Sequence, residues 1–166
     1  MEILKIIVTG DTHLPAGKKK LPEKLLEACR NADLILHTGD WKTLDVYREL
    51  SQYAAVKGVY GNADGEDITQ VFPIREIFEV VGMRIGMVHG HGEKKTTERR
   101  VLEIFEDDQA DIIIFGHSHI PYVRYHGKTL LINPGSPTAK RKLPYFSFIT
   151  LDITECVQAE IVFFND

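Results

Sequence analysis

Three runs of apolar residues in the first part of the chain predict β-strands, at residues 3–9, 33–40 and 54–62. The segments between them carry apolar residues at helical spacing, namely Leu21, Leu25, Leu26 and Cys29, and then Leu44, Tyr47, Leu50 and Ala54. Pro22 suits the first turn of the first helix, and Thr43 is a suitable N-cap for the second. This strand–helix–strand–helix–strand order predicts parallel strands joined by helical crossovers.

The pattern changes after Pro73. Residues 75–90 predict a hairpin that turns at Gly82, residues 96–108 a helix with a threonine cap, and residues 110–119 another buried strand. The rest of the chain predicts short strands, at residues 122–127, 128–133, 145–153 and 157–164. We therefore expect one mixed α/β domain over residues 1–166, with parallel strands first and antiparallel strands at the end.

Composition narrows the classes of function. The chain of 166 residues is 43% hydrophobic and 27% charged, and its net charge of −4 gives no strong case for nucleic-acid binding. No apolar run approaches the roughly 20 residues that span a membrane, so no membrane partner is expected. Cys29 and Cys156 form no CxxC pair, which favours a cytoplasmic location.

Polar side chains that can bind metals follow five of the predicted strands. They lie in the segments Gly10–His13, Gly39–Asp40, Gly61–Asp64, His89–His91 and Gly116–His119. Five of the seven histidines fall in these segments. Ligands of open α/β sheets bind outside the carboxyl ends of the strands, so we expect these side chains to meet in one crevice.

The chemistry of this set indicates metal ions. Imidazoles, carboxylates and one amide without a thiolate suit borderline divalent ions such as manganese, iron, nickel or zinc. A metal-free hydrolytic site is less favoured, because the chain has no GxSxG motif and neither cysteine lies in these segments. Six or seven ligands are too many for one catalytic ion, so the set suits two ions that share a carboxylate. Asp40 is the candidate bridge, because it stands alone on its loop.

The order GDxH, GD, GNxD, HGH and GHxH resembles the calcineurin-like metallophosphoesterase superfamily. The short chain and the sequence INPGS at residues 132–136 are similar to the bacterial and archaeal phosphodiesterase branch of that family. The resemblance extends from residue 6 to about residue 136. It implies an α/β fold in which a two-sheet mixed β-sandwich is flanked by helices, an αββα arrangement.

The resemblance also implies roles for the metal-binding residues. It places Asp11, His13 and His119 on one ion and Asn62, His89 and His117 on the other, with Asp40 shared. His117 and His119 are one residue apart, and alternate residues that leave a strand point the same way. The expected cofactor is a pair of divalent ions, with manganese favoured over nickel, iron or zinc. Asp40, Asn62 and His91 are the candidate catalytic residues, and His91 is either a substrate contact or a support of its loop.

The GNxD segment departs from the family pattern. Many members have GNH followed by an acidic residue, and that histidine serves the leaving group or the phosphate, whereas this chain has Ala63. The source of a general acid is therefore open. Asp64 matches the last position of the segment, and we expect it to support the site from outside the metal shell.

The predicted function is hydrolysis of phosphodiester bonds, in which a hydroxide held by both ions attacks phosphorus in line. The expected partner is a small phosphodiester, with nucleotides among the candidates, and a homo-oligomer is compatible with the sequence. Two alternatives remain. One is a non-catalytic scaffold, because one eukaryotic branch of the same fold binds proteins in a membrane-trafficking coat. The other is a phosphomonoesterase.

Several residues near these segments have simpler interpretations. His37 and His126 are expected to be structural, since a single histidine at a strand end usually is. Trp41 either forms a wall of the site or packs beneath it, and Ser136 is a weak candidate for substrate contact. The lysine-rich runs 18–20 and 140–142 are expected to be solvated faces, although the second could reach a phosphate.

Overall fold

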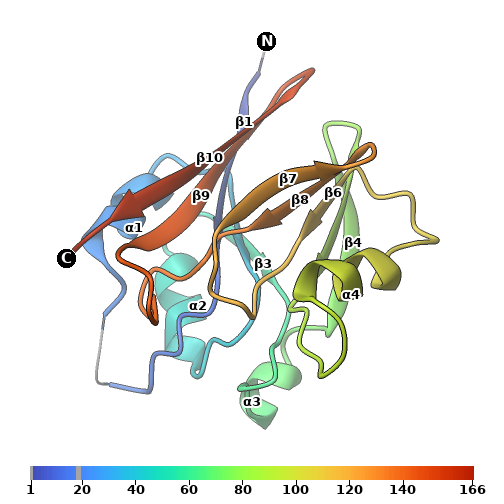
Figure 1. Ribbon diagram of the computed structural model, residues 1–166. Coiled ribbons are helices and arrows are strands. Elements are labelled where there is room, and N and C mark those ends of the chain that lie inside the picture. Colours follow the sequence, from blue (N-terminus) through green and yellow to red (C-terminus); the bar gives the residue numbers. More distant parts are fainter. Residues whose placement is uncertain (1, 18–19) are drawn as a thin grey trace.

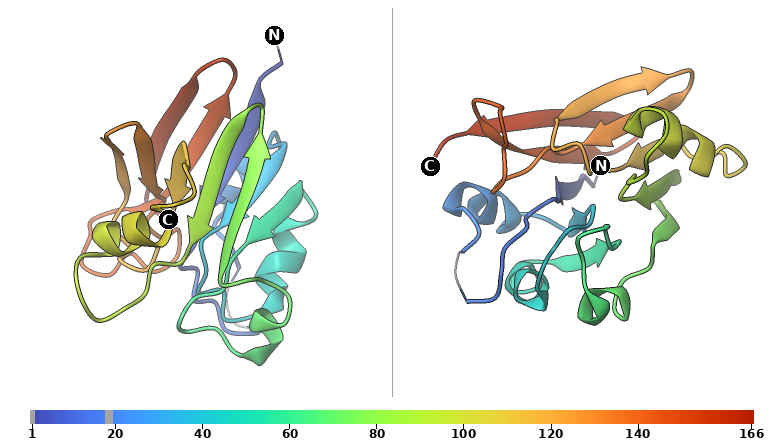
Figure 2. Two further views of the ribbon diagram at one scale, coloured as in Figure 1. Left: turned by 90° about the vertical axis from the view of Figure 1, so that its right-hand side faces the viewer. Right: turned by 60° about the horizontal axis from the view of Figure 1, so that its bottom comes forward.

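Two five-stranded sheets pack face to face in the computed structural model, which describes residues 2–17 and 20–166 (Figure 1). Helices cover the outer faces, with α1 and α2 on one side and α4 on the other (Figures 1 and 2). This is the helix-flanked two-sheet sandwich that the family resemblance implies. Of the predicted solvated run 18–20, Lys20 is exposed and the other two lysines lie outside the described residues.

The first sheet has the strand order β10-β9-β1-β2-β3. Its strands are β1 (Leu4–Thr9), β2 (Leu34–His37), β3 (Ala55–Gly58), β9 (Phe146–Ile153) and β10 (Val157–Phe164). β1, β2 and β3 pair in parallel, with Ile7 opposite Ile35 and Ile35 opposite Val56. β9 and β10 add an antiparallel hairpin to the other edge of β1.

The second sheet has the strand order β4-β5-β6-β8-β7. Its strands are β4 (Arg75–Val80), β5 (Met83–Val88), β6 (Ile112–Ile114), β7 (Tyr122–His126) and β8 (Thr129–Asn133). The hairpin at Gly82 is confirmed. The expected antiparallel strands at the end of the chain form the pairs β7–β8 and β9–β10, but β6 also pairs in parallel with both β5 and β8, which the sequence did not predict. The β7–β8 hairpin places its second strand beside β6, so β8 runs in the same direction as β6.

Four helices connect these strands within the described residues, namely α1 (Glu23–Cys29), α2 (Leu44–Leu50), α3 (Glu66–Thr69) and α4 (Thr97–Ile104). Thr43 caps α2 through the Asp45 N–H, and Thr96 caps α4 through the Arg99 N–H, as the sequence predicts. α2 ends before Ala54, which the pattern had placed on it. The short helix α3 was not predicted, because one turn is too short to show a period. No helix in the described part of the chain has the length and apolar character to cross a membrane.

Side chains along each strand alternate between the core that lies between the two sheets and the core that lies beneath the helices. Ile6 and Val8 of β1 point between the two sheets, where they meet β5, β6 and β8. Ile7 points to the opposite face and packs beneath α1 and α2 with Trp41. A third cluster lies between α4 and the second sheet. The carboxyl ends of strands from both sheets are thereby held on a rigid support.

Trp41 packs beneath the candidate site rather than forming a wall of it. The side chain is fully buried, with its ring stacked on His37 at a centroid distance of 3.6 Å and on Phe72 at 4.3 Å. Its indole N–H donates to the Val59 carbonyl oxygen at 2.9 Å. A side chain at Gly58 would collide with the indole ring, so glycine is needed there.

We predict that Trp41→Phe lowers the free energy of unfolding by about 1–3 kcal/mol, because the buried Val59 carbonyl would lose its partner. Urea denaturation followed by far-UV circular dichroism measures this change. Tyr125→Phe is the matched control, since Tyr125 is 60% exposed, and its midpoint should not move. Equal midpoints for parent and Trp41→Phe would contradict the prediction.

Candidate metal centre

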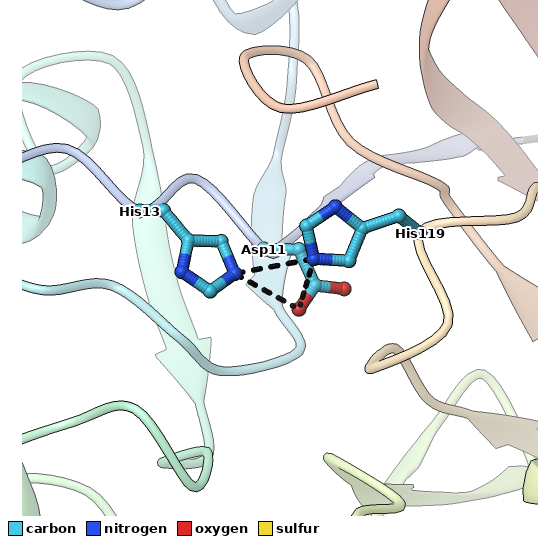
Figure 3. Close-up of side chains that lie close together, drawn as sticks. All are labelled: Asp11, His13 and His119. Carbon is cyan, nitrogen blue, oxygen red and sulfur yellow. Dashed lines mark hydrogen bonds and ion pairs between the residues drawn. The ribbon is translucent and has the colours of Figure 1, made fainter. Parts of the chain in front are cut away.

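The predicted metal-binding segments come together where strands of both sheets end. Asp11 follows β1 and Asp40 follows β2 in the first sheet, while His89 follows β5 in the second. His119 lies in the loop after β6 and reaches the same place. Figure 3 shows the rings of His13 and His119 turned toward the carboxylate of Asp11.

Two overlapping groups of these side chains could each hold a metal ion. The first contains Asp11, His13 and His119, and its three ligand atoms all lie within 4.8 Å of one another. Nε2 of His13 is 3.2 Å from Nε2 of His119 and 3.7 Å from Oδ1 of Asp11. Nε2 of His119 is 3.5 Å from the same carboxylate oxygen. Three atoms with lone pairs therefore face one small volume.

The second group contains Asp11, Asp40 and His89. Nε2 of His89 is 3.1 Å from Oδ2 of Asp40 and 3.8 Å from Oδ1 of Asp11. Oδ2 of Asp40 is also 3.4 Å from Nε2 of His13, so Asp40 lies between the two groups. Oδ1 of Asp11 also contacts histidines of both groups. The geometry thus gives two carboxylates a central position, where the sequence suggested only Asp40.

Unpartnered buried atoms show that a metal ion fits this set. Oδ1 of Asp11 and Nε2 of His89 are buried without a hydrogen bond, which is costly for polar atoms unless a ligand completes them. Nδ1 of His89 donates to the Thr38 carbonyl oxygen at 2.8 Å, and Nδ1 of His119 contacts the Ala139 carbonyl oxygen at 2.5 Å. Each ring therefore keeps its proton on Nδ1 and turns the lone pair of Nε2 inward, as in metal-binding histidines.

Backbone N–H groups fix the remaining carboxylate oxygens. Oδ2 of Asp11 accepts from the His117 N–H at 2.9 Å, and Oδ1 of Asp40 accepts from the Ala63 N–H at 2.8 Å. Asp64 accepts from the N–H groups of Asp40 and Gly61 at 2.8 Å each and from the N–H of Lys42 at 2.9 Å. Asp64 therefore orients Asp40 from outside the cluster, which is the supporting role that the sequence suggested.

Charges within the cluster shift two pKa values in opposite directions. Burial alone would raise the pKa of Asp40, but the nearby His89 and the Ala63 N–H outweigh it and hold that pKa well below its usual range. Burial would lower the pKa of His89, but the carboxylates of Asp40 and Asp11 raise it above its ordinary value. A metal ion binds only the neutral ring, so a metal ion and a proton would compete for Nε2 of His89.

The other histidines of the site favour the neutral form. Burial lowers the pKa of His119, and burial together with the charge of His89 lowers the pKa values of His117 and His91. Neutral imidazole is the form that binds metals. These rings are therefore ready to act as ligands at neutral pH.

Three predicted site residues lie outside the two groups. The His117 ring is half-buried, with its centroid 5.3 Å from that of His89. The His91 ring is 5.7 Å from that of His89, and its Nδ1 is buried without a partner. Asn62 is exposed. The cluster therefore contains five of the seven predicted ligands, with His117 and His91 at its edge.

The backbone of the ligands is in the left-handed region at five of the seven predicted positions. These are Asp11, His13, Asp40, His117 and His119, with φ between 46° and 71°. The expectation that His117 and His119 continue an extended strand is therefore wrong, because both have positive φ. Such conformations cost on the order of 1 kcal/mol or more each and gather at functional sites. The backbone of Gly61 also lies very close to Asp40, because a side chain at Gly61 would collide with Oδ1 of Asp40.

Sequence reasoning missed how the loops are tied together. His37 is structural, as expected, but it also joins two ligand loops, because its ring contacts Oγ1 of Thr12 at 3.1 Å and accepts from the Gly39 N–H at 3.1 Å. Ser136 donates to the Asp11 carbonyl oxygen at 2.8 Å and is buried, so its hydroxyl supports the loop of Asp11. Asn133 donates to the Gly116 carbonyl oxygen at 3.0 Å. The INPGS sequence marks this segment as notable, but it does not reveal that Asn133 and Ser136 bond to the loops of Gly116 and Asp11.

Comparisons with known proteins agree with this geometry. The family model of the calcineurin-like phosphoesterase superfamily domain matches residues 4–156. A probable metallophosphoesterase of Methanothermobacter thermautotrophicus is 34% identical over 156 residues, which cover 93% of this chain and 90% of that protein. A protein named as a phosphodiesterase in Methanocaldococcus jannaschii is 29% identical over 147 residues, or 80% of this chain and 83% of that protein.

A solved structure extends the likeness to three dimensions. Vps29 from Entamoeba histolytica, crystallised in complex with zinc, is 25% identical and has a TM-score of 0.75, over 97% of this chain and 99% of that one. The family model covers far more than half of the chain, and the Methanothermobacter relative is similar over nearly its whole length. The chain therefore belongs to the calcineurin-like phosphoesterase superfamily.

Proposed function

We propose that the protein is a dinuclear metal-dependent phosphodiesterase. The observation that carries this proposal is the pair of buried carboxylates, Asp11 and Asp40, set among three inward-facing imidazole nitrogens with two atoms unpartnered. Membership of a phosphoesterase family gives the reaction class, and the relative named as a phosphodiesterase supports the choice of a diester.

We assign the ligands in two sets. One ion would take Asp11, His13 and His119, the other Asn62, His89 and His117, and Asp40 would be shared. The first set needs little movement, since its ligand atoms already lie within 4.8 Å of one another. The second set requires His117 and Asn62 to turn toward His89. Manganese is the favoured ion, with nickel, iron or zinc as alternatives, because the ligands mix imidazole with carboxylate.

The bound ions would supply an activated water and neutralise charge on the phosphoryl oxygens. The protein residues then have separate tasks. Asp40 and Asp11 hold and centre the ions, and Asn62 and His91 contact the phosphoryl group from the edge. A neutral His91 can donate an N–H to a phosphoryl oxygen, and its lowered pKa favours that form.

The first alternative is a non-catalytic protein-binding scaffold, and the structural similarity to Vps29 is the observation that supports it. The buried cluster favours the enzyme, because a protein-binding surface has no need for left-handed, unpartnered ligands. A phosphomonoesterase is the second alternative. Metal content together with turnover of a mono- and a diester of p-nitrophenol separates the three.

Removal of metal is expected to abolish turnover and to lower the melting temperature by about 5 °C or more, because the ions bind only the folded state. The measurements are metal content, bis(p-nitrophenyl) phosphate hydrolysis and a thermal melt, before and after chelation. Added manganese should restore both properties. Full turnover with metal content near zero would show that the proposal is wrong.

Asp40→Asn is expected to weaken metal binding by at least about 100-fold, since even residues outside the metal shell can cost 10–100-fold. His91→Ala should retain its metal and lose turnover only, because His91 lies outside both groups. Metal titration by calorimetry, paired with diester hydrolysis, compares the two variants. Equal loss of metal in both would mean that His91, rather than His89, is the ligand in this segment.

Ala63→His tests how the leaving group departs. A positioned acid raises the rate by about 10²–10⁴-fold when the leaving group is poor. Ala63 cannot act as an acid, so alkyl diesters should be hydrolysed much more slowly than aryl diesters. The substitution should speed alkyl diesters most and flatten the dependence of rate on leaving-group pKa. Ala63→Gln is the control, with similar bulk and no titratable group.

A series of diesters with graded leaving groups, run on all three proteins, measures this dependence. A parent rate that hardly varies across the series, with chemistry rate-limiting, would mean that another residue donates the proton. His91 would then be the first residue to test, because its ring lies 5.7 Å from that of His89 and it is not assigned to either ion.

A further inference from the structure

A pocket of about 410 Å³ opens directly beside the candidate metal centre. One side is formed by Ser118, His119 and Ile120 in the loop after β6, and the other by residues 140–143 in the loop after β8. We call it the Ile120–Leu143 pocket. His119 belongs to both the metal cluster and the lining of this pocket, so the pocket adjoins the cluster.

The wall of the pocket is mainly apolar. Ile120 is 55% exposed and presents its apolar side chain to the pocket. Leu143 lies opposite in the lining. The ammonium group of Lys140 is directed to the Pro144 carbonyl oxygen at 3.2 Å and lies 5.3 Å from the centre of the Phe146 ring. Its aliphatic stem therefore adds to the apolar wall.

The rim of the pocket is strongly basic. Arg141 and Lys142 are exposed, and neither has a carboxylate partner within ion-pair distance among the described residues. With Lys140, they gather three positive charges on a chain whose net charge is −4. Arg141 lines the same pocket as His119, which is a member of the metal cluster.

We propose that the Ile120–Leu143 pocket binds the retained ester group of the substrate, and that this group combines a planar ring with a further negative charge. The substrate class is then a nucleotide-type phosphodiester that carries an additional phosphate. This inference rests on the proposed phosphodiesterase function.

Size and chemistry both favour such an occupant. The volume falls within the range of about 300–1,000 Å³ found for small-molecule sites, which are mostly apolar with a few placed polar groups. A flat ring suits the apolar lining to which Ile120 and Leu143 contribute, and a guanidinium such as that of Arg141 stacks well on aromatic faces. A phosphate beyond the ring would meet Arg141 and Lys142 in charge-assisted hydrogen bonds.

Three substrates with the same p-nitrophenolate leaving group test the pocket. They are the p-nitrophenyl phosphodiesters of methanol, of the thymidine 5′-hydroxyl, and of the 5′-hydroxyl of thymidine 3′-phosphate. Because the leaving group is constant, differences in kcat/KM report how the retained group is bound. Turnover of the methyl ester tests the proposed function, and the ratios between substrates test the pocket.

The parent protein is expected to prefer the phosphorylated thymidine ester over the methyl ester. Arg141→Ala and Lys142→Glu should each lower the advantage of the added phosphate by about tenfold, the effect of one charged hydrogen bond. Leu143→Ala should lower the preference for both thymidine esters over the methyl ester. All three variants should hydrolyse the methyl ester at the parent rate.

Lys128→Glu is the matched control, because Lys128 is exposed in the β7–β8 turn and does not line the pocket. It should leave all three rates unchanged. Ratios of kcat/KM between the three substrates that are identical in the parent and in the Arg141, Lys142 and Leu143 variants would overturn the inference. Failure to hydrolyse even the methyl ester with metal present would instead overturn the proposed function.

Discussion

Two carboxylates buried at the ends of neighbouring strands set the main constraint on this structure. Asp11 and Asp40 lie at the carboxyl ends of β1 and β2, almost without access to water. Buried negative charges are costly unless positive charge and hydrogen bonds surround them. Backbone N–H groups of Ala63 and His117 meet part of this requirement by donating hydrogen bonds to the two carboxylates. A cation would supply the remainder, and the surrounding ligand groups are placed where they could hold one.

The protein surrounds these charges with loops that are tied to one another rather than to a single element. Asp64 holds the loop of Asp40, His37 joins the loops after β1 and β2, and Asn133 and Ser136 hold the loops after β6 and β1. These bonds offset the cost of the left-handed backbone at the ligands. The two sheets form a rigid support for these loops, because the core between them is closely packed.

The sequence predicted most of the fold and the members of the cluster, because strand periodicity and the residues that follow each strand are local signals. Thr43 and Thr96 could be read as caps for the same reason. The direction of the strands in the second sheet could not be predicted, because the partners of β6 depend on contacts between distant segments. The inward position of His119 and the outer position of His117 depend on backbone angles that no pattern of side chains encodes. The Ile120–Leu143 pocket likewise needs two loops brought together by the sheet.

The stacking of Trp41 on His37 has a consequence for experiments in solution. The chain has a single tryptophan, and it lies next to Asp40 in sequence and against a ring that joins two ligand loops. Its fluorescence therefore comes from one fixed place beneath the cluster, in an environment set by the stacked imidazole. Changes in the loops above it would alter the emission, so the unlabelled protein carries its own optical probe of the site.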